Sequence, residues 1–168
     1  MHNLREQLRH CMEGRVCLMG LGSLDYGDDG FGVRLVERLI EAGMADVVIA
    51  GTTPDRCLGR VVRERFDQLI FLDAVEFGAA PGAFVLLDTE EILARFPQVS
   101  THKISVGVLA EWVEADGHTQ AWLLGVQPES LKPAKSLTPK VQATLDALSE
   151  LLCALKATKT RHAVEMNP

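Results

Sequence analysis

The chain has 168 residues, of which 47% are hydrophobic and 24% charged, and its formal net charge is -6 at pH 7. This length and balance fit one compact globular domain with an ordinary hydrophobic core. The negative charge argues against a nucleic-acid-binding protein, because neutralising phosphates requires a basic surface.

The first half of the chain alternates short apolar runs with helical patterns. Apolar runs predict buried strands at residues 15–22 and 68–73, and residues 47–50 predict a further strand between them. Apolar residues at helical spacing predict a helix from Phe31 that Gly43 ends. Thr53 followed by Pro54 is typical of an N-cap and a first helical residue, and predicts a short helix through Val62.

The second half continues this alternation. Residues 83–87 predict a strand that is antiparallel because its link is short, and residues 121–126 predict the last strand. Asp88 and Glu91 form a predicted capping box for a helix through Phe96. A terminal helix beginning at Pro139 carries its apolar face on Val141, Leu145, Leu148, Leu152 and Leu155.

Residues 103–115 fit two patterns. Ile104, Val106 and Val108 alternate as in a strand, whereas Ile104, Val108 and Trp112 follow helical spacing. The length of the segment favours the helix.

The order of these elements predicts the fold class. Strands that alternate with helices form a mostly parallel sheet with helices on both faces, which is a three-layer α/β sandwich, here with one antiparallel strand. We expect a single domain over residues 13–157, preceded by an N-terminal extension at 1–12. The polar residues 158–168 predict a disordered tail.

Cysteine spacing and hydropathy indicate where the protein resides. Cys11, Cys17, Cys57 and Cys153 form no C-x-x-C pair. They therefore indicate neither a disulfide framework nor a structural zinc site, but reduced thiols. The charged N-terminus lacks the apolar core of a signal peptide, and the apolar runs are too short to span a bilayer. We therefore expect a cytoplasmic protein without membrane insertion.

Candidate site residues lie where the predicted parallel strands end, which is where ligands bind in such sheets. Asp28 and Asp29 follow the first strand, Asp73 ends the third, and His102 precedes the helix in 103–115. Two carboxylates and an imidazole suit a divalent metal such as zinc or nickel and leave coordination positions open. Such a site supports metal-assisted hydrolysis.

Each candidate also has a structural interpretation. Either aspartate of the doublet suits an N-cap for the following helix, and His102 alone suits a polar surface loop. Asp73 is harder to explain structurally, because a buried carboxylate needs a partner. Gly51, Thr52 and Gln127 also lie at strand ends, where they suit either substrate binding or turn formation.

Competing motifs are disfavoured. The segment from Gly20 to Asp25 begins like a dinucleotide fingerprint, but Asp25 occupies the third glycine position. There is no P-loop motif. Cys57 and His102 suggest a thiol nucleophile with its base, but Cys57 lies within a predicted helix and is better interpreted as a core cysteine.

Five sequence blocks resemble a known family, the nickel–iron hydrogenase maturation endopeptidases. These are GLGSLDYGDDGFGVRLVERL, GTTPDR, FLDAVEFGAAPG, STHKIS and LLGVQPES, in the order of the family. The blocks lie between about residues 15 and 155 and cover nearly the whole predicted domain. One departure is Ser23, where the family usually has asparagine.

The resemblance implies a twisted five-stranded sheet between helices and an enzyme that removes the C-terminal extension of a nickel–iron hydrogenase large-subunit precursor. It also implies that Asp29, Asp73 and His102 bind metal, namely nickel supplied by the loaded precursor, or another divalent metal such as zinc. It implies a monomer. Two alternatives stay open, a metal-dependent hydrolase of another substrate and a non-catalytic maturation factor that binds nickel or precursor.

Overall fold

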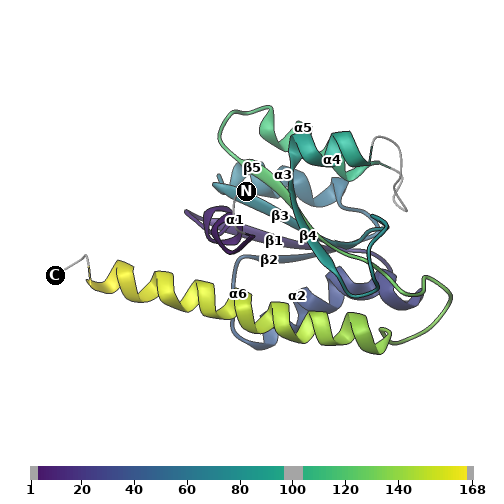
Figure 1. The fold of residues 1–168 in the computed structure, drawn as a ribbon. Coiled ribbons are helices and arrows are strands. Elements are labelled where there is room, and N and C mark those ends of the chain that lie inside the picture. The colour runs from purple at the N-terminus through teal and green to yellow at the C-terminus, as the bar shows by residue number, and fades with distance from the viewer. Residues whose placement is uncertain (1–3, 97–103, 166–168) are drawn as a thin grey trace.

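The computed structural model of the chain describes residues 4–96 and 104–165. Within them, five strands form one sheet in the order β2-β1-β3-β5-β4 (Figure 1). The strands are β1 Val16–Leu21, β2 Val47–Gly51, β3 Gln68–Ala74, β4 Phe84–Asp88 and β5 Gln120–Val126. The helices are α1 Leu4–Cys11, η1 Gly27–Gly30, α2 Phe31–Glu41, α3 Asp55–Arg63, α4 Thr89–Arg95, α5 Val106–Glu114 and α6 Pro139–Glu165.

The sheet is mixed, with one antiparallel strand at its edge. β1 pairs in parallel with β2 and β3, and β3 pairs in parallel with β5. β4 is antiparallel as predicted, but its partner is β5, not the preceding β3. The short link after β3 therefore does not form a hairpin, because β5 lies between the two strands.

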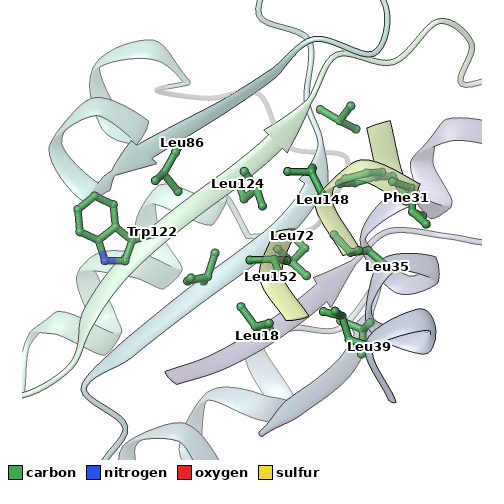
Figure 2. Packing of buried hydrophobic residues seen from close by; sticks show 14 of the residues in the cluster. Leu18, Phe31, Leu35, Leu39, Leu72, Leu86, Trp122, Leu124, Leu148 and Leu152 are labelled. Carbon is green, nitrogen blue, oxygen red and sulfur yellow. The ribbon is translucent and has the colours of Figure 1, made fainter. Parts of the chain in front are cut away.

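Helices cover both faces of the sheet, which confirms the three-layer α/β fold (Figure 1). One buried cluster joins the sheet to α1, α2 and α6, and a second joins it to α3, α4 and α5. In the first, Leu18, Leu72 and Leu124 of three strands face Leu35 of α2 and Leu148 of α6 (Figure 2). Burying each leucine contributes about 1.5–3 kcal/mol. Every residue of β1 and β3 is buried, as expected for central strands covered on both faces.

The ends of the chain depart from the predicted boundaries. Leu8, Cys11 and Met12 are buried in the first cluster, so residues of the predicted N-terminal extension contribute to the core. The segment 158–168 was predicted to be disordered, yet α6 continues to Glu165. The earlier, packed turns of the same helix supply the nucleus from which it extends through this polar segment.

The local start signals are confirmed with one exception. Asp88 Oδ1 accepts from the Glu91 backbone N–H at 2.9 Å, and Glu91 Oε2 accepts from the Asp88 N–H at 3.1 Å, which completes the predicted capping box. The exception is α3, where Pro54 and not Thr53 occupies the N-cap position, without a side-chain cap. In the described part of the chain, no helix is both long and apolar enough to cross a membrane.

The segment 103–115 does contain a helix, α5, but its buried face differs from the expected apolar stripe. Val108 and Trp112 are 50% and 55% exposed, whereas Val106, Leu109 and Val113 are buried. The helical prediction is therefore confirmed although the residues that suggested it face solvent.

The first turn of α2 lies unusually close to the central strands. A Cβ atom added at Gly20 of β1 would lie 2.4 Å from the carbonyl oxygen of Gly32. A Cβ at Gly32 would lie 1.9 Å from the carbonyl oxygen of Leu72 in β3. Only glycine allows this approach, which places η1 at the carboxyl ends of β1 and β3.

We predict that Gly32→Ala lowers the free energy of unfolding by about 1–3 kcal/mol or more, because the methyl group forces α2 away from β3. Gly59→Ala is the matched control, since the nearest atom to its Cβ is the flexible Arg63 Nη1 at 3.4 Å. Alanine there is expected to stabilise by up to about 1 kcal/mol through helix propensity. Chemical denaturation measures both values, and equal stability of the two variants would contradict the close approach.

Candidate active site

The turn after β1 holds Asp29 in a fixed position. A Cβ at Gly22, whose φ is +106°, would lie 1.8 Å from the Asp29 carbonyl oxygen. The Ser23 backbone N–H donates to Asp29 Oδ2 at 2.7 Å, and Ser23 Oγ accepts from the Asp25 N–H at 3.3 Å. The serine hydroxyl thus bonds the backbone of this turn, and the backbone of the turn orients the Asp29 carboxylate.

The second carboxylate oxygen of Asp29 has different surroundings. Asp29 is only 7% exposed, and its Oδ1 has no hydrogen-bond partner among the described residues. Burying such an oxygen without a partner costs free energy that a bound cation or donor would recover. The atom therefore fits a ligand position for a divalent cation.

Asp73 lies at the carboxyl end of the neighbouring strand. It is 3% exposed, and its Oδ1 accepts from the Ala74 backbone N–H at 2.9 Å. β1 and β3 are paired up to Gly20 and Leu72. Asp29, in the turn after β1, and Asp73, near the end of β3, therefore lie at the carboxyl ends of adjacent parallel strands. Two buried carboxylates at one sheet edge suit a divalent cation.

His102, the third predicted ligand, lies outside the described residues. Within residues 4–96 and 104–165, no three His, Cys, Asp or Glu side chains form a cluster able to hold a metal ion. The trio therefore stays a prediction in which two members follow neighbouring strands.

Asp28 has a structural role that the sequence did not indicate. Neither aspartate of the doublet caps α2, because Gly30 is its N-cap and receives no side-chain bond. Asp28 is fully buried, and its Oδ2 accepts from the N–H groups of Glu129 and Ser130 at 2.8 and 3.1 Å. Its Oδ1 accepts from the Thr138 N–H at 2.7 Å. Asp28 therefore fastens the loop between β5 and α6 to η1.

The contacts of the three possible substrate-binding residues support turn formation. Gln127 is 9% exposed, and its Oε1 accepts from the N–H groups of Phe77 and Ala79 at 2.9 and 3.3 Å. Gly51 has a φ of +57° and accepts from the Gly22 N–H at 3.0 Å, whereas Thr52 is exposed. Gln127 thus holds the loop that follows Asp73, and a substrate role for all three stays a prediction.

The cysteines are poorly suited to nucleophilic catalysis. All four are free thiols. Burial raises the pKa of Cys11 and of Cys17 to about 12, and burial also raises the pKa of Cys57. Cys57 packs against the second core cluster, as expected of a core cysteine. Because the thiolate is the nucleophile, burial makes Cys11, Cys17 and Cys57 poorer nucleophiles at neutral pH.

We predict that Asp28→Asn lowers the free energy of unfolding by about 2–4 kcal/mol, because the new amide group faces backbone donors that the carboxylate accepted. The control is Asp25→Asn, an exposed carboxylate in the same turn, with an expected change within about 0.5 kcal/mol. Thermal and urea unfolding measure both. A stability equal to that of the control would show that Asp28 does not fasten the loop.

Comparison with known proteins places this chain in a family. A family model described as HycI, hydrogenase maturation protease, matches residues 33–155. The hydrogenase 2 maturation protease of Escherichia coli (strain K12) is 33% identical over 151 residues, which cover 84% of this chain and 91% of that protein. The hydrogenase expression/formation protein HupD of Rhodobacter capsulatus is 32% identical, with 85% and 72% covered.

Solved structures agree. The [NiFe] hydrogenase maturation protease HycI from Thermococcus kodakarensis KOD1 superposes with a TM-score of 0.79 at 28% identity, covering 89% of this chain and 97% of that one. The hydrogenase maturating endopeptidase HybD from E. coli gives a TM-score of 0.71 at 31% identity, with 86% and 93% covered. The chain therefore belongs to the hydrogenase maturation protease family and is an endopeptidase of hydrogenase maturation.

Proposed function

We propose that this endopeptidase removes the C-terminal extension of a nickel–iron hydrogenase large-subunit precursor after the metal centre of the precursor has been loaded. The observation that carries the proposal is the buried Oδ1 of Asp29, which has no hydrogen-bond partner among residues 4–96 and 104–165 and lies at the sheet edge where Asp73 also lies. The family membership supplies the reaction class, and one solved relative is described as a [NiFe] hydrogenase protease.

The proposed metal-binding residues are Asp29, Asp73 and His102, and the proposed ion is the nickel of the precursor, with zinc or another divalent ion as the alternative. Carboxylate and imidazole ligands suit both metals. The Ser23 N–H donates a hydrogen bond to Asp29 Oδ2, so Oδ1 is the oxygen that serves as the proposed metal ligand. A bound divalent ion polarises a carbonyl or lowers the pKa of its water, which is the chemistry that amide hydrolysis requires.

This assignment explains the proposed order of events. Asp29 and Asp73 place two carboxylates close to the incoming chain, and these carboxylates attract a cation. A precursor without nickel gives these carboxylates nothing to bind, so the extension is not held in position for cleavage. Cleavage therefore follows metal loading. The family resemblance also implies a monomeric enzyme. Because burial raises the pKa of Cys17 and Cys57 and so keeps these thiols protonated, water is the favoured nucleophile.

We predict that Asp29→Asn lowers kcat/KM for a nickel-loaded precursor by more than about 100-fold, because a direct ligand matters at least as much as an outer-shell group. Its free energy of unfolding is expected to be unchanged or higher, since the amide oxygen still accepts from Ser23 and a buried charge is removed. Asp25→Asn is the control with unchanged cleavage. Intact-mass measurement of the precursor and urea unfolding test both parts.

Asp73→Asn and His102→Ala extend this test to the alternatives. Loss of cleavage with retained precursor binding supports catalysis and argues against a non-catalytic maturation factor. A nickel-loaded precursor that keeps its full mass with the wild-type enzyme would favour a hydrolase of another substrate. Full cleavage by all three site variants would remove Asp29, Asp73 and His102 from the mechanism.

We further predict that Cys57→Ser cleaves the precursor at a rate within about twofold of the wild type, because a thiol whose pKa is raised by burial is not a nucleophile at neutral pH. Single-turnover cleavage followed by mass measures the rate. A loss comparable to that of Asp29→Asn, in a variant that unfolds normally, would revive the cysteine mechanism.

A further inference from the structure

A cavity lies beside Asp73 at the carboxyl end of β3. Its volume is about 80 Å³. It is lined by Ile92 from α4, Phe96 directly after α4, Val106 from α5 and Leu131 from the loop after β5. Among its described lining residues, Asp73 and Glu76 are the charged ones. The cavity is therefore apolar with an acidic edge, and that edge belongs to the candidate active site.

The lining selects for an aliphatic group. Apolar walls favour an apolar occupant, and neither carboxylate offers a partner to an anionic one. An engineered cavity that binds benzene has a volume of about 150 Å³. At about 80 Å³, this cavity matches a branched aliphatic side chain more closely than an aromatic ring.

The cavity is formed before any substrate arrives, because its walls are fastened independently. The Asp88–Glu91 capping box fixes the start of α4, and Ser105 Oγ accepts from the Val108 N–H at the start of α5. Asp28 holds the loop that carries Leu131. These contacts join α4, α5 and this loop around one opening next to Asp73.

We propose that this cavity is the specificity pocket of the protease and that it receives an aliphatic side chain of the precursor from a residue next to the scissile bond. The proposal rests on the proposed function, which places the scissile carbonyl near Asp73. Asp73 is also part of the cavity wall. An extended chain advances only about 3.3–3.6 Å per residue, so the side chain that enters belongs to a residue adjoining the cleaved bond.

Changing the size of the pocket tests this assignment. Val106→Phe fills the cavity, and Leu131→Ala enlarges it. The matched control is Val108→Phe, which introduces the same substitution on the exposed face of α5. The substrates are a nickel-loaded precursor and variants in which each residue adjoining the cleaved bond, located by product mass, is replaced by Ala, Leu, Phe or Asp.

At one of these substrate positions, the wild-type enzyme and Val108→Phe should cleave the leucine substrate at least about tenfold faster than the phenylalanine and aspartate substrates. Val106→Phe should instead prefer alanine, and Leu131→Ala should accept phenylalanine. Circular dichroism checks that the variants fold, and Leu131 is half-buried, so its change leaves the core intact.

The same preference in the wild type, Val106→Phe and Leu131→Ala would overturn the pocket assignment. That outcome differs from failure of the proposed function, in which the wild-type enzyme leaves the unaltered nickel-loaded precursor uncut.

Discussion

The close contact between the start of α2 and the two central strands is the constraint on which the rest of the site depends. Gly20, Gly22 and Gly32 lie where any side chain would collide with backbone atoms. Because the helix can lie directly on β1 and β3, the turn before it projects over the ends of these strands. The Asp29 carboxylate thereby comes to the edge where β3 ends in Asp73 and Ala74. A looser packing would leave the same residues in place along the chain but separate them in space.

Two adjacent aspartates in this turn have different roles because their oxygens have different partners. Both oxygens of Asp28 accept hydrogen bonds from the loop after β5, so this carboxylate is saturated and acts as a fastening. One oxygen of Asp29 accepts from Ser23, and the other is buried without a partner among the described residues. A saturated carboxylate has little capacity for a cation, whereas a half-saturated one has an oriented lone pair to offer. The number of donors around each residue therefore gives Asp28 a structural role and leaves Asp29 Oδ1 available for the proposed cation.

The same fastenings connect the candidate site to the cavity beside it. Gln127 binds the loop after Asp73, and Asp28 binds the loop that carries Leu131. Both loops thus hold a fixed shape without substrate, which reduces the ordering that substrate binding would otherwise require. In the proposed reaction, the precursor meets the acidic site and the apolar pocket together, and a rigid receptor lowers the entropic cost of that step.

Sequence alone determined the features that depend on neighbouring residues. The buried strands, the end of α2 at Gly43 and the capping box of α4 follow from apolar spacing, backbone freedom and hydrogen bonds within a few residues. Tertiary structure decided what depends on distant partners. The sequence could not show that β5 separates β3 from β4, or that Val108 and Trp112 face solvent, because pairing and burial are set by packing. It placed Asp28 and Asp29 equally at a strand end. The family resemblance singled out Asp29, but the role of Asp28 became clear only from donors that lie more than a hundred residues further along the chain.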